Sequence, residues 1–227
     1  MKLVGLTGGI ACGKTQTSLF LRQLGIPVID CDEIAHDVVR KGTWGYRRVL
    51  KAFSSHIQAI LQPNDELDRE ALATIVFNDA TARRRLNKAT HFPVLFGIVK
   101  QIVGYWITFK PVVVIDMPLL FETGFFKLTR PNILVTCTSD LQLQRLKDRN
   151  NIAQEDAEAR VASQMPEQKK VKLADVIINN DGTLGELKGK VAAIDQMHLQ
   201  RWRWVHRTLL SPAGIATMGA LLWRLLN

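Results

Sequence analysis

Cysteine is scarce in this chain of 227 residues, and the three that it has, Cys12, Cys31 and Cys137, form no Cys-x-x-Cys pair. This scarcity excludes a disulfide-built scaffold and a cysteine-rich metal module. It predicts a reducing compartment, in which the three side chains serve as small apolar fillers. No signal peptide or Arg/Ser-rich transit segment precedes the first predicted strand, so we expect an intracellular protein, cytoplasmic or on the cytosolic face of a mitochondrial or peroxisomal membrane.

Acidic residues are in the minority, 21 against 30 basic ones, which gives a net charge of +9. Residues 201–227 contain four arginines and no acid, so they carry +4 and leave +5 for residues 1–200. The modest remainder suits a protein that handles phosphorylated small molecules. Because the chain also lacks an aromatic platform or a recognisable nucleic-acid motif, we predict no nucleic-acid partner.

The opening of the chain contains a phosphate-binding pattern, Gly-x-x-x-x-Gly-Lys-Thr, between Gly8 and Thr15. A short apolar run, residues 2–6, precedes it as a strand, and apolar residues at helical spacing follow it. Glycines let backbone N–H groups close around phosphate oxygens at the positive end of the new helix. The predicted nucleotide-binding residues are Gly8, Gly9, Ile10, Ala11, Cys12, Gly13, Lys14 and Thr15. Lys14 would reach the β- and γ-phosphates of the nucleotide, and the Thr15 hydroxyl would bind Mg²⁺.

A second short strand, residues 27–32, ends in Asp30 and Asp32. Ligands of open parallel sheets bind beyond the carboxyl ends of the strands, so an extended strand would turn both acids toward a second substrate. We predict that Asp32 positions an acceptor hydroxyl and takes its proton. The alternative is that Asp32 only caps a helix over residues 33–39.

Residues 42–110 lack a strong strand signal and are predicted to form a helical insertion that closes over the acceptor. Pro93 is expected to break or begin a helix there. The arginine triplet at 83–85 is typical of a solvated helix face, and His91 of a structural histidine.

The clearest central strand is the β-branched run 111–116, which ends in Asp116. An acid at this place in a P-loop protein binds Mg²⁺ directly or through water, so Asp116 joins Thr15 as a candidate metal ligand. Glu122, which follows shortly after, is a candidate acceptor contact.

After a strand at 132–136, two arginine-rich helices indicate a lid over residues 140–166. Ser139 and Asp140 are predicted to cap the first helix. Arg145 and Arg149 are the catalytic candidates, because migrating phosphoryl charge needs fixed cations. Arg160 is a further candidate, and surface salt bridges are the alternative for each arginine.

The last strand, residues 175–178, leads into a turn at 179–182 that contacts adenine in this fold class, which makes Asn180 a nucleotide contact. We therefore predict an α/β kinase domain over residues 1–200, with a P-loop NTPase-type parallel sheet flanked by helices. The tail 201–227 is basic and aromatic, then apolar but interrupted. It predicts either peripheral or tail-anchored membrane contact, or a helix packed on the body or on a partner.

Several segments resemble the signatures of the dephospho-CoA kinase family, in the family's order, over residues 1 to about 185. They are residues 4–11, 28–32, 116–122, 157–160, 164–166 and 174–180. The resemblance implies that ATP phosphorylates the ribose 3′-hydroxyl of dephospho-CoA, the last step to coenzyme A, and that Asp32 is the base. The hydrophobic tail is similar to that of eukaryotic members.

Some residues depart from the family pattern. Cys12 and Thr15 stand where serine is usual, and Thr15 keeps the hydroxyl. Asn179 and Asp181 replace the usual aspartate and asparagine, and residue 92 is inserted into the family's Thr-His-Pro.

Three other functions compete with this interpretation. One is a P-loop kinase for a nucleoside or a sugar acid, and another is a membrane-tethered nucleotide-binding protein without turnover. The third is a regulatory GTPase, which would need the base-reading pattern Asn-Lys-x-Asp. The sequence argues against it, because the only Asn-Lys pair, at 87–88, is followed by alanine and threonine. The sequence leaves the oligomeric state open.

Overall fold

A computed structural model describes residues 1–209, without the side chains of Asn78, Arg201 and residues 206–209. The chain divides into two compact units, residues 1–28 with 106–227, and residues 29–105. The helical insertion was predicted at 42–110, and the second unit begins earlier, within the second strand.

The sheet has five strands, β1 (Lys2–Gly8), β2 (Val28–Asp30), β3 (Val112–Asp116), β4 (Asn132–Thr136) and β5 (Val176–Asn179). Their order across the sheet is β2-β3-β1-β4-β5, and the pairs β1–β3, β1–β4 and β4–β5 are parallel. Every residue of β3 and β4 is buried, as expected of parallel strands that are covered on both faces. The predicted α/β fold class is confirmed.

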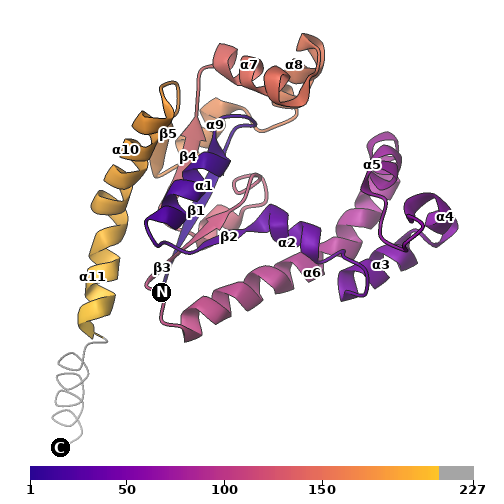
Figure 1. Cartoon of the computed structure of the whole chain (residues 1–227), viewed down its shortest axis with the longest axis horizontal. Helices are drawn as coiled ribbons and strands as arrows, with labels where there is room; N and C mark the ends of the chain where they lie inside the picture. The colour runs from indigo at the N-terminus through magenta and orange to yellow at the C-terminus, as the bar shows by residue number, and fades with distance from the viewer. Residues whose placement is uncertain (210–227) are drawn as a thin grey trace, which may run out of the picture. The chain divides into compact units, whose positions relative to one another are not determined.

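The helices of the first unit follow strands or each other along the chain (Figure 1). They are α1 (Lys14–Gln23), the 3-10 turn η2 (Phe125–Leu128), α7 (Ser139–Asn150), α8 (Gln154–Ala162), α9 (Glu167–Leu173), α10 (Leu184–Ile194), the π-helical turn η3 (Asp195–Leu199) and α11 (Gln200–Leu209). Apolar side chains of α1 and α10, such as Leu21 and Val191, join Val4 and Ile133 of the strands in one core. This core fixes the strand-to-helix turn between β1 and α1.

The second unit is helical, as predicted. It contains α2 (Cys31–Asp37), α3 (Trp44–Ala52), η1 (Ser54–His56), α4 (Ile57–Ile60), α5 (Arg69–Asn78) and most of α6 (Ala80–Ile107). Its own core includes Tyr46, Val49, Phe53 and Ile60. Thr43 and Asp68 cap α3 and α5 by accepting backbone hydrogen bonds.

Pro93 lies inside α6, so the prediction that it breaks or begins a helix was wrong. A proline cannot donate the hydrogen bond to the carbonyl four residues earlier, which here belongs to Ala89. The Arg48 guanidinium supplies that bond, with Nε 2.9 Å from the Ala89 oxygen and Nη2 3.2 Å from the Lys88 oxygen. Arg48 also lies over the Trp44 ring. A side chain from α3 thus lets the long helix continue through its proline.

After β5, α10 passes directly into the π-helical turn η3, and α11 follows that turn. Asp195 in that turn is buried and accepts from Arg203, whose Nη1 lies 3.2 Å from both carboxylate oxygens. Within residues 1–209, no helix has the length and apolar character needed to cross a membrane.

We predict that Arg48→Ala lowers the free energy of unfolding by about 1–3 kcal/mol, the usual cost of leaving a buried carbonyl without its partner. Arg47→Ala, an exposed arginine on the same helix, should cost at most about 0.5 kcal/mol. In a Pro93→Ala background residue 93 regains its N–H, so Arg48→Ala should cost less there. Equilibrium urea denaturation of the four variants measures both effects, and equal costs in the two backgrounds would contradict this role of Arg48.

Candidate active site

The phosphate loop joins β1 to α1 through two residues with positive φ. Ala11 has φ 59° and Gly13 has φ 96°, so the backbone turns sharply before α1 begins at Lys14. A Cβ on Gly13 would lie 2.2 Å from the Asn180 Nδ2 atom, which leaves room only for glycine. The loop therefore presents backbone N–H groups at a helix N-terminus, the arrangement that binds phosphate.

Lys14 and Asp116, which the sequence assigned separately to phosphate and metal, form an ion pair with each other. The Lys14 Nζ atom lies 2.5 Å from Asp116 Oδ1, and the Asp116 side chain is almost fully buried. A buried carboxylate requires such a compensating charge. The strand end of β3 thus holds the lysine at the base of the phosphate loop.

The candidate metal ligands fit Mg²⁺ by chemistry. Mg²⁺ usually keeps several waters and takes one or two protein oxygens besides those of phosphate. Thr15 is exposed in the first turn of α1, and Asp116 is the last residue of β3 in the same unit. Among the described residues, no group of three His, Cys, Asp or Glu side chains forms a metal cage. Thr15 and Asp116 remain predicted ligands.

Asn180 supports the loop through its side chain. Its Nδ2 atom donates to the Cys12 carbonyl oxygen at 2.9 Å, and the residue is buried. The carbonyl of Asn180 in turn accepts from Arg145 Nη1 at 2.9 Å. Asn180 was predicted to contact adenine and Arg145 to stabilise phosphoryl charge, and both roles remain predictions. The structure places the two residues in a chain of hydrogen bonds that reaches the phosphate loop.

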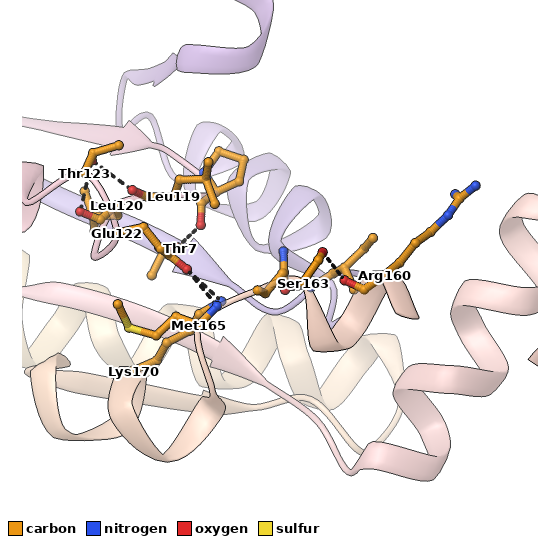
Figure 2. Close-up of polar contacts among 12 residues, drawn as sticks. Thr7, Leu119, Leu120, Glu122, Thr123, Arg160, Ser163, Met165 and Lys170 are labelled. Atoms are coloured by element: carbon orange, nitrogen blue, oxygen red, sulfur yellow. Dashed lines mark hydrogen bonds and ion pairs between the residues drawn. The ribbon is translucent and has the colours of Figure 1, made fainter. Parts of the chain in front are cut away.

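The other lid arginines are exposed. Arg149 donates from Nε to the Asn150 side chain at 2.9 Å. Figure 2 shows the Arg160 side chain extending away from the neighbouring polar contacts, while its carbonyl accepts from the Ser163 hydroxyl. The catalytic role of Arg149 stays a prediction.

Glu122, the candidate acceptor contact, bonds to the segment that follows α8 (Figure 2). Its Oε1 atom lies 3.5 Å from Lys170 Nζ and accepts from the Met165 N–H at 3.4 Å. The Lys170 side chain is only 3% exposed, and a buried ammonium needs a carboxylate partner. Glu122 therefore has a structural role in addition to any contact with an acceptor.

Asp32 belongs to the second unit and lies in the first turn of α2, since β2 ends at Asp30. The prediction of an extended strand through Asp32 was wrong. Asp30 caps the helix, because its Oδ1 atom accepts from the N–H groups of Asp32 and Glu33 at 2.9 and 3.1 Å. The N-cap of α2 is therefore Asp30 and not Asp32. Asp32 itself is exposed.

Cys12 of the phosphate loop contacts Cys137, which directly follows β4. Cys12 Sγ and Cys137 Sγ are 3.2 Å apart, and both residues are buried. The contact lowers the pKa of Cys137, chiefly because the Cys12 thiol stabilises its thiolate, and it raises the pKa of Cys12. The two buried thiols are hydrogen-bonded to each other. This is consistent with the prediction that the cysteines are small buried side chains of the core.

No supporting role was predicted from the sequence for Gln142, Gln164 or Asp181. The two glutamines hydrogen-bond the backbone of Ile10. Asp181 Oδ1 accepts from the Thr138 N–H at 2.7 Å, at the N-terminus of α7, so the prediction of Ser139 and Asp140 as caps was wrong. A carboxylate at that end is favoured by the helix dipole, but its distance of 43 residues in sequence hides it from local patterns.

Fold and loop together define a P-loop nucleotide-binding protein of the α/β class. The family model described as dephospho-CoA kinase matches residues 2–186. The chain belongs to the dephospho-CoA kinase family, a family of ATP-dependent phosphotransferases, and the resemblance inferred from the motifs is confirmed.

Individual relatives agree with this assignment. A dephospho-CoA kinase of Arabidopsis thaliana is 43% identical over 82% of this chain and 79% of its own length. One from Geobacillus kaustophilus is 41% identical over 88% and 96%. The solved dephospho-CoA kinase of Campylobacter jejuni is 29% identical, with a TM-score of 0.66 over 86% of this chain and 96% of that one. A Thermus thermophilus structure reaches a TM-score of 0.73 at 28% identity, over 86% and 97%.

The cap of α7 makes a prediction about acid stability. The pKa of Asp181 lies below its usual 3.8 because the Thr138 N–H and the Asn179 amide donate to the carboxylate. A lowered folded-state pKa stabilises the protein above pH about 4, and the stabilisation is lost as pH falls through the folded pKa. Denaturation across the acid range should therefore show a shallower pH dependence for Asp181→Asn than for wild type.

Asp140→Asn is the control for this experiment, because it removes an equal charge from the same end of α7. Superimposable profiles for wild type and Asp181→Asn would contradict the proposed cap.

Proposed function

We propose that this protein transfers the γ-phosphoryl group of ATP to the 3′-hydroxyl of the ribose of dephospho-CoA, giving coenzyme A and ADP. Family membership over residues 2–186 carries the proposal. The phosphate loop that ends in Lys14, with Asp116 paired to it, is the geometry that supports it.

The candidate site residues have different roles in the proposed phosphoryl transfer. The loop N–H groups and Lys14 hold the β- and γ-phosphates, and Arg145 and Arg149 offset the charge that develops on the migrating phosphoryl group. Thr15 and Asp116 would hold Mg²⁺, which would supply positive charge to offset the negative charge of the phosphates. Asp32 aligns the ribose hydroxyl and accepts its proton, and its exposed place in the first turn of α2 leaves the carboxylate accessible to a substrate.

The proposal predicts that Asp32→Asn lowers turnover at least ~10²-fold with ATP binding unchanged, the usual scale for losing acid–base assistance. Glu33→Gln, an exposed neighbour in the same helical turn, should keep turnover near wild type. ADP release with dephospho-CoA, and with a nucleoside and a sugar acid as alternative acceptors, measures the turnover of both variants.

Near-normal turnover of Asp32→Asn would remove Asp32 from the mechanism. Faster ADP release with one of the other acceptors would instead make this chain a kinase for a different alcohol, whatever Asp32 does.

We further infer that the C-terminal tail contacts a membrane surface peripherally. Trp202 and Trp204 on α11 are 49% and 67% exposed, and tryptophan favours the interface between lipid headgroups and acyl chains. Arg203, in contrast, is held by Asp195, so its charge is partly offset within the protein. The apolar sequence 210–227 lies outside the described residues, and its part in this contact is inferred from sequence alone. The reducing compartment predicted from the cysteines stays a prediction.

The membrane proposal predicts that the full chain sediments with vesicles of phosphatidylcholine and phosphatidylserine, and that a chain ending at Leu209 sediments less. Trp202→Ala/Trp204→Ala in the full chain should also reduce binding, because the indole rings no longer insert. Equal sedimentation of all three proteins with the vesicles would refute the proposed membrane contact. ADP release by the shortened chain checks that it remains folded.

A further inference from the structure

One residue of the phosphate loop, Ile10, has both of its backbone polar groups bonded to glutamine side chains from distant parts of the chain. The Ile10 N–H donates to Gln164 Oε1 at 3.0 Å, and Gln142 Nε2 donates to the Ile10 carbonyl at 2.8 Å. Gln142, on α7, is only 6% exposed. Gln164 follows α8, so both ends of the arginine-rich segment are tied to the same loop residue.

The place of this contact matters because the next residue is strained. Ala11 has φ 59°, a left-handed conformation that costs a residue with a Cβ free energy. Such a conformation persists only where the surroundings over-determine it. Ile10 is fixed on one side of Ala11 by the two glutamines, and on the other side the Cys12 carbonyl is fixed by Asn180.

Packing shows that the approach of Gln142 is close. A Cβ placed on Gly9 would lie 2.8 Å from Gln142 Nε2 and 2.8 Å from Cys12 Sγ. The absence of a side chain at Gly9 therefore leaves space for the glutamine amide.

We propose that Gln142 and Gln164 are positioning residues for ATP, which clamp Ile10 and keep the phosphate loop in its binding conformation before the nucleotide arrives. A preformed loop spares ATP the cost of ordering it, so the clamp should act mainly on nucleotide affinity. The inference takes ATP as the ligand from the proposed function and is independent of the acceptor.

The two glutamines use opposite ends of their amides, and this gives a matched test. Gln164 accepts a hydrogen bond, so Gln164→Glu keeps the acceptor. Gln142 donates, so Gln142→Glu replaces the donor by an oxygen that faces the Ile10 carbonyl. Both substitutions preserve shape and add the same charge near the phosphates. Methionine at either position removes the hydrogen bond without adding charge.

Titration calorimetry with ATP should show Kd raised about tenfold or more for Gln142→Glu, and within about threefold of wild type for Gln164→Glu. Both methionine variants should weaken ATP binding, so that at position 164 glutamate restores what methionine loses. With dephospho-CoA as acceptor, KM for ATP should rise more than kcat falls.

Equal weakening by the two glutamate variants would overturn the proposal, since charge alone would then explain the effect. A fall in melting temperature with unchanged ATP affinity would also overturn it, because the glutamines would be structural only. If Gln142→Glu fails to fold, the two variants at position 164 still test the proposal. ATP affinity should be lowered in Gln164→Met and near wild type in Gln164→Glu, and equal affinities of these two variants would overturn the proposal. Wild-type protein that binds ATP but leaves dephospho-CoA unphosphorylated would refute the proposed function and not the clamp.

Discussion

The site depends on one constraint: the loop between β1 and α1 must turn its backbone N–H groups toward phosphate and still hold a single shape. Positive φ at Ala11 and Gly13 gives the turn its shape but costs free energy at Ala11. Hydrogen bonds from side chains to the loop's own backbone offset that cost. Gln142 and Gln164 hold Ile10, and Asn180 holds Cys12, each from a segment that follows a strand on the same side of β1.

Among the residues that the structure describes, three buried charged side chains are each paired with an opposite charge. Asp116 is paired with Lys14, Lys170 with Glu122, and Asp195 with Arg203. The first pair holds Lys14, the predicted phosphate-binding cation, whereas the second fixes the segment after α8 and the third fixes the π-helical turn. Since a buried charge without a partner is strongly destabilising, each pair also restricts where its element can lie. The pair at the phosphate loop therefore obeys the same rule as the two pairs with a structural role.

Local patterns predicted the elements well and their caps less well. The buried runs of β3 and β4 and the helical second unit follow from hydrophobic periodicity, which needs only neighbouring residues. Pro93 inside α6 and the Asp181 cap of α7 could not be predicted in this way. Arg48 is 41 residues from the Ala89 carbonyl that it bonds, and Asp181 is 43 residues from Thr138. Asp32 illustrates a further limit: one hydrogen-bonding side chain, Asp30, ended the strand two residues early.

The sequence by itself determined the family, the phosphate loop and the class of reaction, since the motif requires its glycines, lysine and hydroxyl at contiguous spacing set by backbone geometry. Only the tertiary structure decided what supports that loop. Glutamine, asparagine and arginine are common surface residues, and nothing in their local sequence distinguishes one that will reach a backbone carbonyl 132 or 168 residues away. That choice is made by strand order and packing, which bring the ends of β4 and β5 beside the loop.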